Sequence, residues 1–109
     1  MSEQTIQISS AENMQELLRT NKIVIVDFYA DWCPPCKAIS PKFDALSREM
    51  LSIKFCKVNI DNLQNIGAQY SISSIPTFIV FFKGQEVNRL VGASIQDIKR
   101  SLELQLEKL

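Results

Sequence analysis

The most informative segment of the chain is residues 22–37, which read KIVIVDFYADWCPPCK. Its first part, Lys22–Ala30, is rich in β-branched and aromatic residues on both faces, which is typical of a central strand covered by helices. The second part holds Cys33 and Cys36, which are separated only by prolines. A strand that runs into a CxxC pair before a helix indicates a redox dithiol, but the same pair could belong to a metal site.

The metal interpretation is the weaker of the two. A structural zinc ion needs four ligands, and one CxxC pair supplies only two thiolates. The third cysteine, Cys56, falls in a predicted strand, and the chain has no histidine. We therefore expect no metal site within one chain, while a site shared between chains stays open. The lack of histidine also excludes Cys-His and Ser-His nucleophilic pairs.

The redox interpretation has a physical basis in the helix that follows the cysteines. Free amides and the positive end of the dipole at a helix N-terminus stabilise a thiolate relative to a thiol. Cys33 gains most from this effect and is expected to be the exposed nucleophile. Cys36 enters the first helical turn, is expected to be more buried, and would resolve the mixed disulfide that Cys33 forms.

The remaining hydrophobic patterns predict alternating strands and helices. We expect strands at Thr5–Ile8, Lys22–Ala30, Ile53–Ile60, Thr77–Phe82 and Glu86–Val91, and helices from Ser9, from Pro35 to Met50, from Asp61 to about Tyr70 and from Ser94 to Leu109. The order βαβαβα and then ββα implies a mixed sheet. Helix-linked strands run parallel, whereas the close last pair forms an antiparallel hairpin.

Short polar patterns indicate where the helices begin. Capping-box spacing is present at Ser9 with Glu12 and at Ser94 with Asp97, and Asp61 with Gln64 could cap the short third helix. Pro41 lies inside the second helical pattern. Because a proline there removes a backbone hydrogen bond, we expect a kink or break near Pro41.

Composition and charge are those of an ordinary globular protein. The 109 residues are 46% hydrophobic and 22% charged, so we expect a single domain over residues 1–109. The 12 basic and 12 acidic residues cancel and form no basic patch, which argues against a nucleic-acid partner. The apolar runs are too short to cross a bilayer, and no secretory signal or lipidation motif is evident. We therefore expect no membrane partner and a cytoplasmic location.

Several motifs, in this order and spacing, resemble the thioredoxin family. They are VDFYADWCPPCK, the helical Pro41, KVNID, SIPT and VGA, and they span nearly the whole chain. The resemblance implies an α/β thioredoxin fold, a five-stranded mixed sheet flanked by four helices. It also implies a protein-disulfide reductase in electron transport and cell redox homeostasis, which needs no cofactor. Such a protein acts as a monomer on disulfide-containing proteins and is regenerated by a thioredoxin reductase.

Asp27 is the expected general acid or base beside the cysteines, and Lys57 is expected to modulate Asp27. Asp27 lies in the apolar strand IVIVDF, where a buried carboxylate is costly and tends to stay protonated. Alternation could instead point it to solvent, but helices are expected over both faces. The family's matching aspartate serves Cys36 as general acid or base. Lys57 matches the family's lysine neighbour of this aspartate, although an exposed strand lysine explains it nearly as well.

The resemblance also implies a substrate-binding rim around the cysteines. The base rate favours a trans Ile75–Pro76 bond, but the family's proline is cis and packs against the disulfide, while Ile75 presents its backbone to an extended substrate. The expected rim residues are Trp32, Pro34, Pro35, Ile75, Pro76, Val91, Gly92 and Ala93. Cys56 is expected to be a small buried hydrophobe rather than a regulatory oxidation site.

The chain departs from the family's common pattern between its cysteines. Pro34-Pro35 replaces the commoner Gly-Pro, and Ser71 and Ser74 stand where many members have glycine. Because Pro34 precedes a proline, we expect the helix to begin at Pro35. Each proline removes an amide that could face the Cys33 sulfur and also stiffens the dithiol. Both effects predict a more reducing pair, which Pro34→Gly would make less reducing.

Two other functions stay open at this point. A tryparedoxin-like or nucleoredoxin-like carrier also uses WCPPC, although those relatives are longer. A non-catalytic binding module would use the same surface only to clamp a partner. The chain retains Cys33, Cys36, Asp27 and Pro76, which argues against the binding module because a scaffold needs no acid–base geometry.

Overall fold

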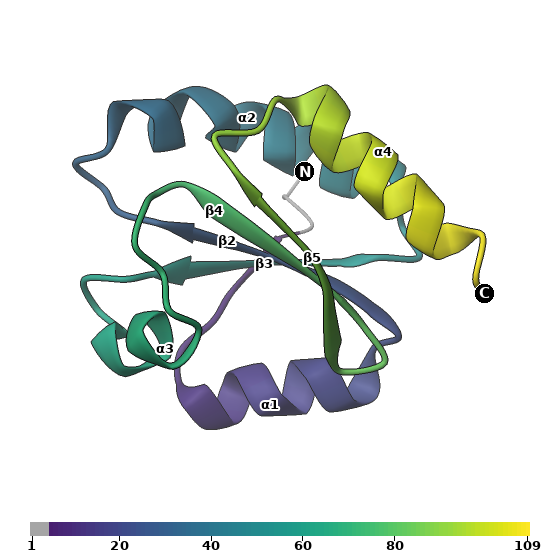
Figure 1. Ribbon diagram of the computed structural model, residues 1–109, viewed down its shortest axis with the longest axis horizontal. Helices are drawn as coiled ribbons and strands as arrows, with labels where there is room; N and C mark the ends of the chain where they lie inside the picture. The colour runs from purple at the N-terminus through teal and green to yellow at the C-terminus, as the bar shows by residue number, and fades with distance from the viewer. Residues whose placement is uncertain (1–4) are drawn as a thin grey trace.

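The computed structural model describes residues 5–109, which form one five-stranded sheet with helices on both faces (Figure 1). The strands are β1 (Thr5–Gln7), β2 (Ile23–Tyr29), β3 (Lys54–Asn59), β4 (Thr77–Phe82) and β5 (Gln85–Val91). The helices are α1 (Ala11–Thr20), α2 (Pro34–Glu49), α3 (Gln64–Gln69) and α4 (Ile95–Leu106). The predicted element order and the mixed sheet with four helices are confirmed.

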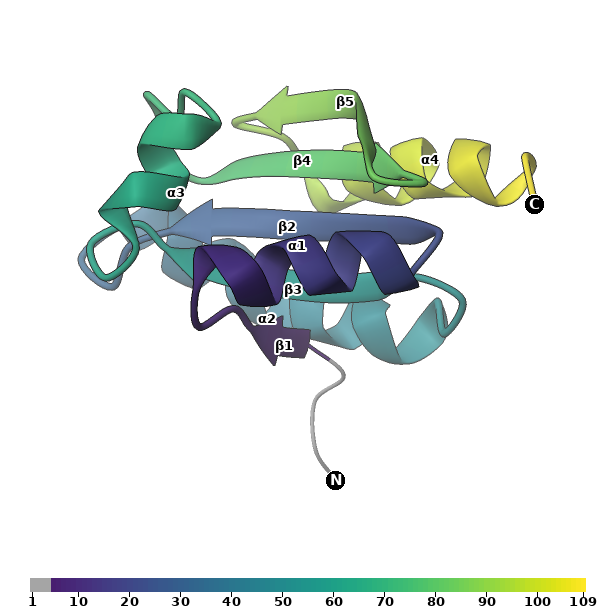
Figure 2. The same ribbon diagram turned by 90° about the horizontal axis from the view of Figure 1, so that it is seen from below.

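The strand order in the sheet is β1-β3-β2-β4-β5 (Figure 2). β1, β3 and β2 run parallel, whereas β4 and β5 are antiparallel to their neighbours. β2 lies at the centre, with β3 on one side and β4 on the other, and its residues 23–28 are all buried. This position explains why the β2 segment is apolar on both faces, and its C-terminal end leads directly into the CxxC pair.

The helices divide into two layers around the sheet. α2 and α4 cover one face, and α1 and α3 cover the other (Figure 1). Successive strand side chains alternate between faces, so Val24 and Val26 pack under α1 and α3, whereas Ile23 and Ile25 pack under α2 and α4. Asp27 follows the alternation of Ile23 and Ile25, and its side chain therefore faces the layer that contains α2.

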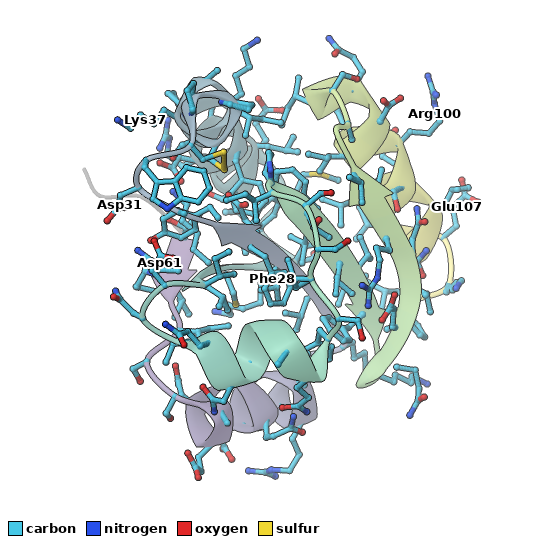
Figure 3. All side chains as sticks on the ribbon, turned by 60° about the vertical axis from the view of Figure 1, so that its left-hand side comes forward. Phe28, Asp31, Lys37, Asp61, Arg100 and Glu107 are labelled. Carbon is cyan, nitrogen blue, oxygen red and sulfur yellow. A yellow bond between two sulfur atoms is a disulfide. The ribbon has the colours of Figure 1, made fainter. Side chains whose placement is uncertain are left out.

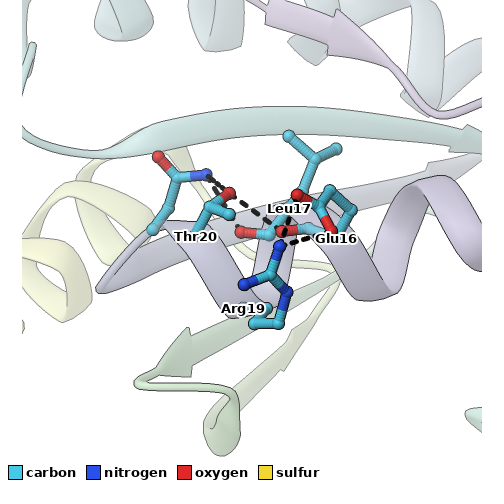
Figure 4. Close-up of polar contacts among 5 residues, drawn as sticks. Glu16, Leu17, Arg19 and Thr20 are labelled. Carbon is cyan, nitrogen blue, oxygen red and sulfur yellow. Dashed lines mark hydrogen bonds and ion pairs between the residues drawn. The ribbon is translucent and has the colours of Figure 1, made fainter.

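The first turn of α1 begins one residue later than the sequence predicts. Its N-cap is Ser10, whose Oγ accepts the Asn13 amide at 2.9 Å, and not Ser9. The Ser9 amide donates to Asn13 Oδ1 at 3.0 Å, so the expected capping box of Ser9 with Glu12 is wrong. At the other end of α1, an exposed ion pair joins Arg19 to Glu16 at 2.7 Å (Figure 4).

The two later helices differ in how their first turns are capped. The expected Ser94–Asp97 capping box of α4 is confirmed, with both reciprocal bonds present. The expected cap of α3 by Asp61 is wrong, because the N-cap is Leu63 and makes no side-chain bond. Within residues 5–109, every helix is too short or too polar to cross a lipid bilayer.

α2 begins at Pro34 and continues through Pro41 to Glu49. The expected start at Pro35 is wrong, because Pro34 occupies the first helical position, where its fixed φ fits and its missing N–H is not needed. Of the kink or break expected near Pro41, the break is absent, because the helix is continuous through this residue. Pro41 and Lys37 are both exposed, so water can bind the Lys37 carbonyl that loses its helical partner.

Ser71 has a backbone conformation that favours glycine. Its φ is +55°, in the left-handed region, where an L residue costs about 1 kcal/mol relative to glycine. Ser74, the other serine at a position where glycine was expected, has no positive φ. The loop before β4 therefore keeps the glycine-like geometry at residue 71 without the glycine.

Candidate active site

Cys33 and Cys36 form a disulfide at the junction of β2 and α2, with their Cα atoms 5.2 Å apart. Figure 3 shows this disulfide near the labelled Asp31 and Lys37. Cys33 is the N-cap of α2, and its Sγ accepts the Cys36 amide at 3.3 Å. The helix N-terminus therefore supports the Cys33 sulfur, as the sequence predicts.

The disulfide form does not show the expected difference in burial between the two cysteines. Cys33 is 3% exposed and Cys36 is 4% exposed, so the prediction of an exposed Cys33 is wrong for this form. Ile75, Tyr29 and Ile60 pack against the pair, and the Cys33 Sγ lies 3.9 Å from the Ile75 carbonyl oxygen. The capping position, and not exposure, distinguishes Cys33 from Cys36.

The Ile75–Pro76 peptide bond is cis, as the resemblance implies. Pro76 is buried, and Ile75 is half-buried against the disulfide. A groove of about 290 Å³ runs beside them, between the start of α2 and the loop from β5 to α4. Its lining includes Pro35, Ala38, Ile39, Pro76, Gly92 and Ala93. The fold thus brings residues of three distant segments together in one groove at the start of α2.

The outer part of the expected rim is exposed and apolar. Trp32 is 65% exposed and Val91 is 58% exposed, so neither side chain belongs to the core. The Trp32 indole N–H donates to Asp61 Oδ2 at 3.0 Å, a partner that the sequence did not suggest. Pro34 and Gly92 are exposed on the same rim. An apolar surface around a reactive disulfide can bind a polypeptide segment.

Asp27 is buried and not solvent-facing, so the solvent interpretation of its position is wrong. It is 2% exposed, and among residues 5–109 its Oδ1 has no hydrogen-bond partner. Burial raises the pKa of Asp27 from its ordinary value of 3.8 to about 7, the Lys57 charge opposes this rise, and the Asp44 charge adds to it. A carboxyl group with this pKa can both give and take a proton near neutral pH.

Lys57 is next to Asp27 in the sheet register, but its ammonium binds elsewhere. It lies 3.1 Å from Asp44 Oδ1 and donates to Ser40 Oγ at 2.9 Å. Its side chain is only 14% exposed, so the interpretation as an exposed strand lysine is wrong. Our reading of the sequence missed Ser40 and Asp44, although Cys36, Ser40 and Asp44 follow one another at helical i, i+4 spacing.

Cys56 lies on the opposite face of the sheet from the disulfide, in the cluster under α1 and α3. It is fully buried, and burial raises the pKa of its thiol to about 12. Cys56 is therefore a small buried hydrophobe at neutral pH, as expected. Residues 5–109 contain no group of three or more His, Cys, Asp or Glu side chains arranged to hold a metal ion.

A larger groove of about 1250 Å³ lies along α1 and the β4–β5 turn. Most of its lining residues have polar side chains, among them Glu12, Arg19 and Lys83. None of its lining residues adjoins the disulfide in the chain, whereas the smaller groove is lined by Pro35 and Pro76, which directly precede Cys36 and follow Ile75. We therefore place the chemistry at the smaller groove beside Pro76.

The positions of the two prolines in α2 predict which of them deprives the Cys33 sulfur of a hydrogen-bond donor. An N-cap side chain accepts amides from the second and third helical positions. Here the third position is Cys36, which donates, and the second is Pro35, which has no N–H. Pro35→Ala should add a donor worth about 1.5 kcal/mol to the thiolate and make the pair less reducing by about 30 mV.

The expectation that both prolines remove an amide from the Cys33 sulfur is wrong for Pro34, which occupies the first helical position. Pro34→Ala is therefore the matched control, because it removes a proline ring without adding an amide that faces the sulfur. The potentials of both variants can be measured by equilibration with glutathione buffers. Any change in Pro34→Ala reports the loss of rigidity alone. An equal potential in the two variants would show that the missing amide at Pro35 is unimportant.

Comparisons with known proteins agree with this arrangement. A family model described as Thioredoxin matches residues 4–104, a range that includes both active-site cysteines and Pro76. The chain is 43% identical to the thioredoxin of Mycoplasma pneumoniae over 86 residues, which are 79% of this chain and 84% of that protein. It is 42% identical to the thioredoxin of Chlamydia caviae over 92 residues, which are 84% of this chain and 89% of that protein.

Solved structures show the same similarity in three dimensions. A thioredoxin from Plasmodium falciparum superposes with a TM-score of 0.86 at 34% identity, covering 90% of this chain and 96% of that chain. A thioredoxin from Fasciola hepatica superposes with a TM-score of 0.87 at 31% identity, covering 92% of this chain and 98% of that chain. The similarity of fold therefore extends over at least 90% of the chain.

Proposed function

The chain belongs to the thioredoxin family and is a thiol–disulfide oxidoreductase, and we propose that it reduces disulfides of protein substrates through Cys33 and Cys36. The observation that carries this proposal is the Cys33–Cys36 disulfide at the N-terminus of α2, against which Ile75, the residue before the cis proline Pro76, is packed. The helix amide at 3.3 Å supports a thiolate at Cys33, and the buried Asp27 supplies a proton acceptor on the same face of the sheet.

The first step is attack by Cys33 on the substrate. The Cys33 thiolate forms a bond to one sulfur of the substrate disulfide, the substrate S–S bond breaks, and the departing substrate thiolate takes a proton from solvent. The product is a mixed disulfide between Cys33 and the substrate. The exposed Trp32 and the groove beside Pro76 bind the substrate backbone and apolar side chains during this step.

The second step releases the substrate. Cys36 loses its proton to Asp27, directly or through a water molecule, and its thiolate attacks the Cys33 sulfur. The mixed disulfide breaks, the second substrate thiolate is protonated, and the Cys33–Cys36 disulfide forms. The substrate has then gained two electrons. A thioredoxin reductase would return two electrons to the disulfide, and a cytoplasmic, reducing compartment would suit this cycle for a monomeric chain.

Insulin reduction tests the proposal. With dithiothreitol as electron donor, the full chain should accelerate precipitation of the insulin B chain at substoichiometric concentration. Absence of any acceleration would contradict a disulfide reductase. A tight stoichiometric complex that survives loss of both active-site thiols would instead favour a binding module. Replacing dithiothreitol by NADPH and a series of reductases would distinguish a general thioredoxin from a specialised tryparedoxin-like carrier.

A further inference from the structure

The ammonium group of Lys57 is anchored on α2. Asp44 Oδ1 lies 3.1 Å from Lys57 Nζ, and Ser40 Oγ accepts a hydrogen bond from the same nitrogen at 2.9 Å. Asp44 is itself held, because Thr5 Oγ1 donates to Asp44 Oδ1 at 3.3 Å from β1. The side chains of Lys57 and Asp44 are only 14% and 22% exposed, so water competes little for these contacts.

This anchor leaves the Lys57 ammonium outside ion-pair distance of the buried carboxyl group of Asp27. Asp27 and Lys57 are direct neighbours in the parallel pairing of β2 and β3, where adjacent strands lie about 4.8 Å apart. A lysine side chain can span that distance. Yet among residues 5–109 no ion pair joins Lys57 to Asp27, and Asp27 Oδ1 has no hydrogen-bond partner.

We propose that Asp44 is a positioning residue that, together with Ser40, holds the Lys57 ammonium away from Asp27 and so leaves the Asp27 carboxyl group free to take a proton. This inference rests on the proposed function, in which Asp27 takes the proton of Cys36. The negative charge of Asp44 and its contact with Lys57 both favour a higher pKa of Asp27. The Asp44 charge adds to the rise in the pKa of Asp27, whereas the Lys57 charge lowers it.

Lys57 and Asp44 are the charged residues that act on the protonation of Asp27, because among residues 5–109 the neighbouring elements offer no other buried charge. β4 carries no ionisable side chain. The remaining charges of α2 and α4 are exposed, namely Lys37, Lys42, Arg48, Glu49, Asp97, Lys99, Arg100 and Glu103. In the reduced protein Cys36 also titrates beside this site, which is why the oxidised protein gives the cleaner measurement.

Titration of Asp27 in the oxidised full chain tests the proposal. The carboxyl carbon of Asp27 can be followed by ¹³C NMR from pH 4 to pH 9, with no contribution from Cys33 or Cys36 because both are in the disulfide. In Asp44→Asn the Asp27 midpoint should fall by roughly one pH unit, since a repelling charge is lost and Lys57 is freed to approach. Glu49→Gln is the control, because it removes an exposed acid from the same helix.

A second pair of variants separates positioning from simple repulsion. In a Lys57→Met background, Asp44→Asn should shift the Asp27 midpoint by less than half as much, because there is no ammonium left to release. Ser40→Ala should also lower the Asp27 midpoint, by a smaller amount. This variant replaces Asp44→Asn in the test if Asp44→Asn does not fold. The acid limb of insulin reduction should move to lower pH together with the midpoint.

Two outcomes would overturn the proposal. One is an Asp27 midpoint in folded Asp44→Asn that equals the wild-type value. The other is a shift of the same size with and without Lys57. The titration does not depend on turnover, so a chain that fails to reduce insulin would refute the proposed function and leave this test unaffected.

Discussion

Replacing Cys33 by serine is expected to lower the rate of insulin reduction by about a thousandfold or more, because a serine hydroxyl cannot supply the thiolate that attacks a disulfide. The helix N-terminus and the Cys36 amide at 3.3 Å stabilise a charge at residue 33 only if the side chain ionises near neutral pH. Cys36→Ser should lose turnover to a similar extent. It keeps the attacking thiolate but cannot resolve the mixed disulfide.

Cys56→Ala is the matched control for these two variants. It also removes one sulfur atom, but Cys56 lies in the cluster on the other face of the sheet, where burial raises its pKa to about 12. Its activity should stay within about twofold of wild type when the chain is folded, because no step of the cycle uses it. A large loss in Cys56→Ala with full activity in Cys33→Ser would reverse the assignment of the nucleophile.

The second large effect concerns stability and pH. In the unfolded chain Asp27 ionises near 3.8, whereas burial raises its pKa in the folded chain to about 7. The folded state therefore binds the proton more tightly, and the related stabilisation is full below pH 3.8 and is lost as the pH rises through about 7. The interval between these values corresponds to a fall of about 4 kcal/mol in the free energy of unfolding.

Asp27→Asn removes this proton linkage. Urea unfolding of the oxidised chain at a series of pH values from 4 to 8.5 should show a steep loss of stability in wild type that is absent from Asp27→Asn. The variant should therefore be the more stable protein, relative to wild type, at the alkaline end. Glu103→Gln, which removes an exposed carboxylate from α4, should keep the wild-type slope. Parallel profiles for wild type and Asp27→Asn would show that Asp27 ionises normally.

The sequence predicts the sheet and the disulfide region well because their signals are local and strong. β2 is apolar on both faces since it is the central strand under two helical layers, and this pattern is visible without a structure. The Ser94–Asp97 box defines the start of α4 for the same reason. The cis bond before Pro76 came only from the family resemblance, because most X-Pro bonds are trans.

The contacts between distant segments were not predictable from the sequence to the same extent. Lys57 was expected beside Asp27, but its ammonium binds Asp44 and Ser40, which approach from α2. The equal burial of Cys33 and Cys36 depends on Ile75, which arrives from a loop far along the chain. Such contacts follow from the packing of α2 on the sheet. Residue spacing alone gives only candidate contact residues, such as those of the i, i+4 series that ends at Asp44.

The attack of Cys33 on a substrate disulfide is tested most directly by mass spectrometry of the trapped intermediate. The Cys36→Ser chain would be mixed with a disulfide-containing protein, quenched with acid and digested without reductant. The account predicts one mixed disulfide, between a substrate cysteine and Cys33. A substrate linked to Cys56, or no linked substrate while Cys36→Ser remains folded, would contradict it.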